Sequence, residues 1–272
     1  MNRRAVAAIV RKDLTVVLRS KAILIPMIVV PLVMLLILPL TMAFIPNLAM
    51  APGAPMSGMD EFMGQMPAAL RQSLAGLDEA QMIIVLMLVH FMAPLYLILP
   101  LMVSSVVAAD SFAGEKERKT LEALLYTPTT DRELYLGKLL SAWLPAMGVA
   151  LGGFVVYTVV ANAAAWPVMG RIFFPNAMWI ALVVWVAPAV AALGLGATAL
   201  ISARVRGFQE AYQLGGIVVL PVVALVIAQA TGVMYFNMGL VLLLGLVLWL
   251  IDGILLGVSL RIFRREKVIE QI

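Results

Sequence analysis

Six long apolar stretches dominate the hydropathy pattern of the chain. They cover residues 23–44, 82–107, 139–163, 178–201, 213–231 and 238–260 approximately. Each has about 19–26 residues, and roughly 20 are needed to cross the hydrocarbon core of a bilayer as an α-helix. Lipid offers no partners to open backbone groups, and the stretches are far too long for barrel strands. The pattern therefore predicts an all-α membrane protein with six transmembrane helices.

The residues before the first apolar stretch alternate with a helical period. Basic residues surround one apolar stripe, which consists of Val6, Ile9, Val10, Leu14, Val17 and Leu18. A basic amphipathic helix of this kind lies in the membrane interface, with its cations near anionic lipids. We therefore expect three parts: an amphipathic elbow helix (1–22), a six-helix transmembrane domain (23–260) and a basic tail (261–272).

Basic residues are distributed very unevenly between the two sides of such a bundle. Seventeen of the 19 Lys and Arg residues fall in the N-terminus, the second and fourth connections and the C-terminus, and only Arg71 and Arg171 fall on the other side. By the positive-inside rule, both termini are cytoplasmic. The composition is 63% hydrophobic and 12% charged, which excludes an ordinary soluble domain. Topology accounts for the net charge of +4 better than nucleic-acid binding does. The chain has no cysteine, which excludes disulfides, thiolate metal sites and a cysteine nucleophile.

The largest external connection covers about residues 46–81. Its first half is rich in Pro and Gly and predicts a loop. Its second half predicts a short amphipathic helix on the outer surface, with one apolar face formed by Met59, Phe62, Met63, Met66, Leu70, Leu74 and Leu77. Thioether sulfur can bind Cu(I). Methionine is common throughout the chain, however, so apolar packing is the favoured interpretation and no metal site is predicted.

The cytoplasmic connection of about residues 108–138 contains the densest charge, GEKERKTLEALLYTP, from Gly114 to Pro128. Gly114 and the pair Lys119-Thr120 lie one glycine short of a phosphate-binding loop. Such a loop needs its glycines so that backbone N–H groups can wrap the phosphates, and an acid there would repel them. The positions before Thr120 carry Glu117, Arg118 and Lys119 instead. The sequence therefore predicts that this stretch is not an ATP site.

The same stretch predicts a bent helical connector. Gly114 can end the second transmembrane helix, and residues 115–127 form a short helix with leucines on one face. Glu115 precedes Lys119 by four residues, the favourable order for a helical ion pair. Pro128 ends this helix, and the capping box of Thr130 and Glu133 begins the next one.

At these residues the chain resembles the type-2 ABC exporter permeases, especially their sodium-export-like branch. The matching positions are Gly114, Glu115, Glu117, Thr120, Leu121, Glu122, Leu124, Leu125, Pro128, Gly137 and Lys138. Lys119 departs from the pattern, because that family usually has glycine there. The layout of an elbow helix and six spans extends the resemblance over the whole chain.

The resemblance implies six helices per chain and a dimer of permeases in the inner membrane of a prokaryote. It also implies a separate cytoplasmic ATPase, which binds ATP and Mg and docks on the matching residues. Glu115, Glu117 and Glu122 would then be exposed docking acids, which we expect to contribute little to folding. The permease has no chemistry of its own, and its cargo is left open.

Two polar residues lie inside the apolar stretches. Asp252 precedes Arg261 by nine residues, about 13 Å along a helix. An intramembrane acid is costly and is a functional candidate, although it can also lock one helix to a neighbour by a hydrogen bond. His90 is the only histidine, and a packed polar role is favoured for it. A secondary transporter that uses Asp252 or His90 as a proton carrier, or a membrane assembly factor, is the alternative function.

Overall fold

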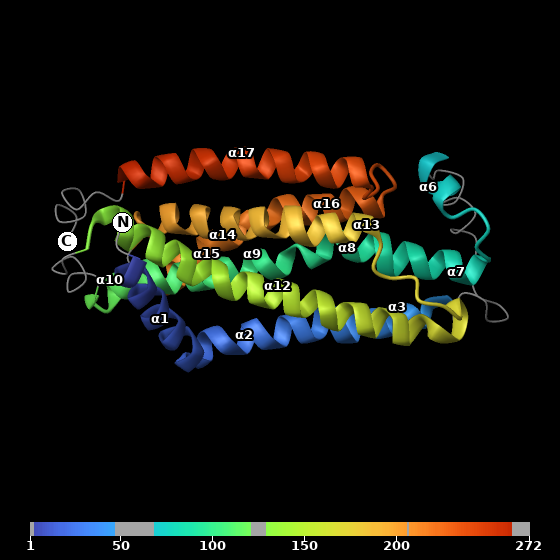
Figure 1. Ribbon diagram of the computed structural model, residues 1–272, viewed down its shortest axis with the longest axis horizontal. Helices are drawn as coiled ribbons and strands as arrows, with labels where there is room; N and C mark the ends of the chain where they lie inside the picture. Colours follow the sequence, from blue (N-terminus) through green and yellow to red (C-terminus); the bar gives the residue numbers. More distant parts are fainter. Residues whose placement is uncertain (1–2, 47–67, 121–128, 206, 263–272) are drawn as a thin grey trace.

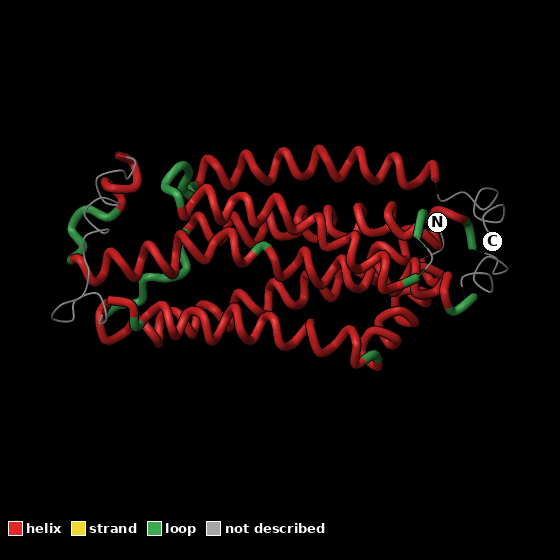
Figure 2. The backbone as a smooth tube through the Cα atoms, turned by 180° about the vertical axis from the view of Figure 1, so that it is seen from behind, coloured by secondary structure: helices red, strands yellow, loops and turns green. Residues whose placement is uncertain are grey.

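The structure is a computed structural model that describes residues 3–46, 68–120, 129–205 and 207–262. The described part of the chain is helical and contains no strand, which confirms the all-α prediction. The helices run roughly parallel to one long axis (Figures 1 and 2). One end of this bundle carries α1 (Arg3–Arg19), and we call it the α1 end. The opposite end carries α6 (Ala68–Ser73) and is called the α6 end.

Within the part of the chain that the structure describes, six helical spans are long and apolar enough to cross a membrane, as the hydropathy pattern predicted. They are Lys21–Ala43, Glu79–Glu117, Arg132–Met169, Ala177–Ser202, Phe208–Ala230 and Met238–Ser259, numbered here as spans 1 to 6. Spans 2 and 4 are mostly buried, whereas spans 1, 5 and 6 leave most of their apolar side chains at the surface. In a bilayer that surface contacts lipid or other membrane helices.

The spans are built from α-helices that are interrupted by π-helical turns. The elements of spans 1 and 2 are α2 (Lys21–Leu32), η1 (Val33–Ile37), α3 (Leu38–Ala43), α7 (Glu79–Ile84), η2 (Val85–Phe91), α8 (Met92–Tyr96), α9 (Ile98–Ala109), η3 (Asp110–Gly114) and α10 (Glu115–Glu117). Span 3 lies in α12 (Asp131–Met169). Spans 4 to 6 comprise α13 (Ala177–Ala181), η4 (Leu182–Val186), α14 (Ala187–Ser202), α15 (Phe208–Gly215), the 3₁₀ turn η5 (Gly216–Val219), α16 (Leu220–Ala230) and α17 (Met238–Ile262).

Three of the four π-helical turns in the described residues end two or three positions before a proline. The prolines are Pro39, Pro94 and Pro188. Proline has no N–H group and its ring clashes with the carbonyl one turn earlier, so the preceding turn widens and carbonyl groups are left over. Two carbonyl groups in η2 accept hydrogen bonds from aromatic side chains. The Tyr157 hydroxyl donates to the carbonyl of Leu88, and the Trp179 indole N–H donates to that of Val89 at 2.7 Å.

The most extensive contact between two helices of the bundle joins α9 of span 2 to α14 of span 4. Gly194 of α14 faces α9, and a Cβ at this position would lie only 2.8 Å from the carbonyl oxygen of Leu101. The absence of a side chain therefore lets the two helix backbones approach closely. The glycine-rich stretch that starts at Gly194 has a packing role here, in agreement with its position inside an apolar span.

At the α6 end, the connection between spans 1 and 2 contributes one short helix to the core. Leu70 and Leu74 are buried against Leu86 and Tyr235, as expected for the apolar face of an amphipathic segment. The helix ends at Ser73, however, and Gly76 has a φ of +90°, so the prediction of one helical face that continues to Leu77 is wrong. Met59, Phe62, Met63 and Met66 lie outside the described residues.

Candidate functional site: a polar cluster at the α1 end

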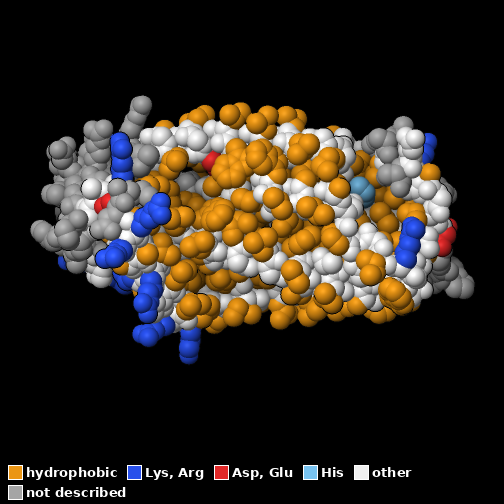
Figure 3. Space-filling model, in the orientation of Figure 1, with side chains coloured by type: hydrophobic (Ala, Val, Ile, Leu, Met, Phe, Trp, Pro, Cys, Tyr) orange, Lys and Arg blue, Asp and Glu red, His pale blue; other side chains and the backbone are white. Residues whose placement is uncertain are grey.

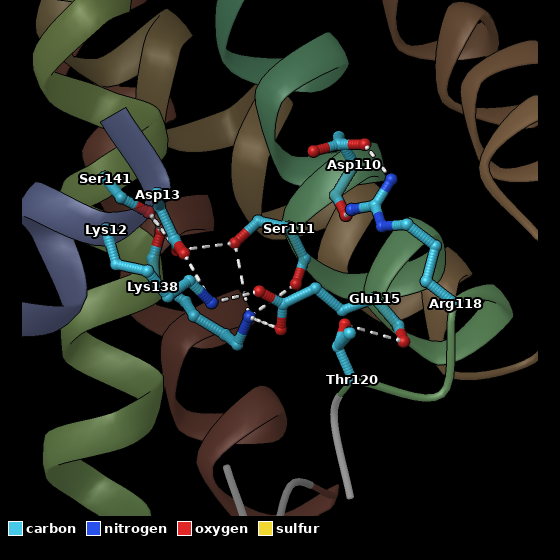
Figure 4. Close-up of polar contacts among 9 residues, drawn as sticks. All are labelled: Lys12, Asp13, Asp110, Ser111, Glu115, Arg118, Thr120, Lys138 and Ser141. Carbon is cyan, nitrogen blue, oxygen red and sulfur yellow. Dashed lines mark hydrogen bonds and ion pairs between the residues drawn. The ribbon is translucent and has the colours of Figure 1, made fainter. Parts of the chain in front are cut away.

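The carboxylate of Glu115 is the centre of a buried polar cluster, shown in Figure 4. It accepts hydrogen bonds from the amino groups of Lys12, on α1, and Lys138, on α12. Glu115 is 5% exposed and Lys138 is 1% exposed, so water cannot replace the contact between these two side chains. One side chain thus joins three elements, α1, α10 and α12.

Asp13 forms the second half of the cluster. Its Oδ2 atom accepts hydrogen bonds from the hydroxyl groups of Ser111 and Ser141, each at 2.9 Å. Its Oδ1 atom lies 2.9 Å from the amino group of Lys12. Burial lowers the pKa of Lys12, but hydrogen bonds to Glu115 and Asp13 outweigh this effect and leave the pKa above its ordinary value.

We call Lys12, Asp13, Ser111, Glu115, Lys138 and Ser141 the Glu115 cluster. Its two lysines balance its two acids, so the cluster is formally neutral. Buried charges are tolerated when they are paired and hydrogen-bonded, and both acids meet that condition. Such a cluster holds its elements in one arrangement, because any displacement would leave a buried charge without its partner.

Sequence reasoning missed the role of Asp13, although a signal was present. Val6, Ile9, Asp13 and Val17 are the buried residues of α1, and they follow one another at helical spacing. An acid in the apolar stripe of a basic helix indicates a buried polar partner on the surface to which the helix packs. The partners themselves come from spans 2 and 3.

Gly137 allows α1 to reach α12. A Cβ at Gly137 would lie 2.9 Å from Cγ2 and 3.1 Å from Cβ of Ile9. The neighbouring Lys138 then pairs with Glu115. Gly137 and Lys138, which the family resemblance assigns to ATPase coupling, therefore have direct contacts with the elbow helix and span 2.

The prediction that Gly114 ends the second transmembrane helix is wrong. The helix passes through Gly114 in η3 and continues to Glu117. A Cβ at Gly114 would lie 2.9 Å from Oδ1 of Asp110 and 3.3 Å from the guanidinium of Arg118. The glycine makes room for the ion pair between these two side chains, at 2.9 Å, rather than for a change of direction.

The chain turns five residues later, at Lys119. Its φ is +56°, the left-handed region that favours glycine. The family usually has glycine at this position. Lys119 therefore stands where glycine would fit the backbone conformation better. The predicted continuous helix over 115–127 is wrong at this turn, and Glu115 pairs with Lys12 and Lys138 instead of forming the expected helical pair with Lys119.

Glu117 connects span 2 to the beginning of span 5. Its Oε2 atom accepts a hydrogen bond of 2.9 Å from the backbone N–H of Phe208, the first residue of α15. A Cβ at Gly207 would lie 2.7 Å from the same oxygen. An acid at a helix N-terminus also interacts favourably with the helix dipole. Lys116 adds a contact of 3.4 Å to the carbonyl oxygen of Val205.

The remaining residues of the family pattern divide into two groups. The hydroxyl of Thr120 donates to the carbonyl of Glu115 at 3.3 Å. Five residues of the family pattern lie outside the described residues, namely Leu121, Glu122, Leu124, Leu125 and Pro128. The capping box at the start of α12 is confirmed, with bonds of 3.3 Å from Glu133 N–H to the Thr130 hydroxyl and 3.0 Å from Thr130 N–H to the Glu133 carboxylate.

The structure places the two intramembrane polar residues in different surroundings. His90 lies in η2, and its Nδ1 atom is 3.0 Å from the carbonyl oxygen of Phe236. Asp252 is 8% exposed and lines a cavity between α12, α14 and α17. Its two carboxylate oxygens have no hydrogen-bond partner among the described residues, so the helix-locking bond considered for this acid is not found there.

These features define a polytopic helical membrane protein whose polar residues hold the α1 end together. The family model described as ABC-2 family transporter protein matches residues 7–250. The chain therefore belongs to the ABC-2 transporter family and is a permease component of an ABC transporter, a membrane transport component rather than a catalytic subunit. The chain matches no curated protein and no solved structure.

Proposed function

We propose that this chain is the transmembrane permease subunit of an ATP-driven exporter, and that a separate ATPase docks on residues 114–138. Membership of the ABC-2 family and the motif at Gly114–Lys138 support this assignment. In this proposal ATP and Mg bind to the partner ATPase, and two copies of the permease form the transmembrane pathway in the inner membrane of a prokaryote.

The length of spans 2 and 3 is the observation that carries the docking proposal. They have 39 and 38 residues, which correspond to about 58 Å of helix each. The hydrocarbon core is only about 30 Å thick, so both helices extend well beyond it. The segment between them is therefore within reach of a soluble partner.

The charge distribution supports a cytoplasmic location for this docking segment. On the face shown in Figure 3, most Lys and Arg side chains lie at the α1 end, while the middle shows hydrophobic side chains among backbone and other atoms and no Lys or Arg. By the positive-inside rule, the α1 end faces the cytoplasm, where ATP is available to the partner.

The Glu115 cluster gives a physical route from the docking segment to the bundle. A displacement of α10 moves Glu115, which is held by Lys12 of α1 and Lys138 of α12. The same displacement moves Glu117, which caps α15. A displacement of this segment would thus move the elbow helix and spans 2, 3 and 5 together. The apolar surfaces of spans 1, 5 and 6 remain available to lipid and to a second permease copy.

The test is co-expression of the permease with candidate ABC ATPases from the same genome, followed by co-purification. Leu121→Asp puts a charge on the leucine face of the motif, and we expect it to abolish ATPase binding and export while the permease stays folded. Glu79→Gln, an exposed change at the opposite end of span 2, is the matched control and should behave as wild type. Full ATPase binding and export by Leu121→Asp would contradict the docking proposal.

A further inference from the structure

The cavity next to Asp252 combines apolar walls with one buried carboxylate. Its volume is about 330 Å³, and its walls include Leu139, Leu195 and Leu256. Leu256 is 39% exposed, so the cavity opens on the side of the bundle. Ligand pockets in proteins have volumes of about 300–1,000 Å³ and are mostly apolar with a few placed polar groups. The space suits a small molecule.

The two indole rings in the wall offer surface but no hydrogen-bond donor. The N–H of Trp143 donates to the carbonyl of Pro188 at 3.1 Å, and that of Trp249 donates to the carbonyl of Trp185 at 3.2 Å. Both N–H groups are therefore occupied. The π-faces of such rings attract cations that lie within about 6 Å. The wall also contains the buried side chain of Tyr135, and Asp252 is the group in the wall whose charge would fix the polar part of a ligand.

Asp252 lacks the partner that a buried carboxylate requires. Its side chain is enclosed, and neither of its oxygens has a hydrogen-bond partner in the described part of the chain. A carboxylate in an apolar environment is stable only when it is protonated or paired with a cation. A ligand with one positively charged N–H group would supply this partner, because a hydrogen bond from a charged donor to a carboxylate is stronger than one between neutral groups.

We propose that this cavity binds a small lipophilic amine, with its ammonium group on Asp252 and its hydrophobic body against Trp143, Trp249 and the leucines. An amine fits better than a lipid tail, because a tail would leave the carboxylate without a partner. Binding requires only this chain. The further step, that such amines are the exported cargo, rests on the proposed function.

The experiment uses the full chain in phosphatidylcholine nanodiscs, with empty nanodiscs as background. Radiolabelled imipramine is the probe, because it joins a protonated amine to an apolar tricycle. Carbamazepine, a neutral tricycle of similar size, is the matched ligand control. We expect saturable binding of imipramine and at least ten-fold weaker binding of carbamazepine.

Three variants locate the binding. Asp252→Asn keeps the shape but removes the charge, and Leu256→Trp fills the cavity but keeps the charge; each should weaken imipramine binding at least ten-fold. Glu79→Gln removes an exposed carboxylate elsewhere and should bind as wild type. Thermal denaturation checks folding, and Asp252→Asn should be at least as stable as wild type because it relieves a buried charge.

The proposal is overturned if wild type does not bind imipramine, if it binds carbamazepine equally well, or if Asp252→Asn binds imipramine unchanged. None of these measurements involves the ATPase. Failure of the amine site and failure of ATPase docking are therefore separate results.

Discussion

Replacement of Glu115 by glutamine should destabilise the permease strongly, although the residue belongs to a stretch that looks like a surface motif. The change leaves the Glu115 cluster with a net positive charge. Lys138, which is 1% exposed, would lose its charged partner and keep neutral ones: the backbone oxygen and hydroxyl of Ser111, the Phe112 ring and the amide oxygen of the new side chain. Removal of one partner of a buried ion pair costs about 3–5 kcal/mol. The bond to Lys12 adds little, because its side chain is 39% exposed and water can solvate it.

The assay is thermal unfolding of the purified permease at one fixed scan rate, since membrane proteins often unfold irreversibly. At about 2–4 °C per kcal/mol, the midpoint should fall by roughly 6–20 °C. The control Glu79→Gln changes an exposed acid and should shift stability by less than about 0.5 kcal/mol.

A double variant separates charge from packing. Glu115→Gln with Lys138→Met removes both charges and leaves the neutral pair of Lys12 and Asp13. Replacement of a complete buried pair is often close to neutral, so the double variant should melt well above Glu115→Gln alone. If Glu115→Gln melts like wild type, or if Lys138→Met lowers the midpoint further, the Glu115 cluster does not hold the α1 end together.

Three other predictions test separate parts of the account. Gly137→Val should lower the free energy of unfolding by about 1–3 kcal/mol, because the new side chain overpacks against Ile9. Adding Ile9→Ala should restore much of that stability in thermal unfolding, and no recovery would refute the contact. A cysteine at Ser57 should react with an impermeant reagent added to intact cells and one at Thr129 should not, because the basic residues place them on opposite sides; equal labelling would refute the topology. The purified permease alone should neither bind nor hydrolyse ATP, and measurable turnover that disappears in Lys119→Ala would overturn this expectation.

The sequence was sufficient for the class of protein and for its spans. An apolar run of about 20 residues has few structural solutions in lipid, and each solution is local to its own segment. The capping box of Thr130 and Glu133 was predictable for the same reason, since both partners lie within one helical turn. The motif that begins at Gly114 indicated the family, which the match over residues 7–250 then showed.

Only the tertiary structure decided what the charges of the motif do. A helical ion pair between Glu115 and Lys119 satisfied every local rule, but the left-handed turn at Lys119 breaks the helix. Glu115 instead pairs with a residue 103 positions away, Lys12, and Asp13 accepts a hydrogen bond from Ser141, 128 positions away. Local periodicity contains no information about such distant partners, because packing of α1 against spans 2 and 3 brings them together. The same packing excludes water, which changes these side chains from surface charges of little energetic weight into a buried network.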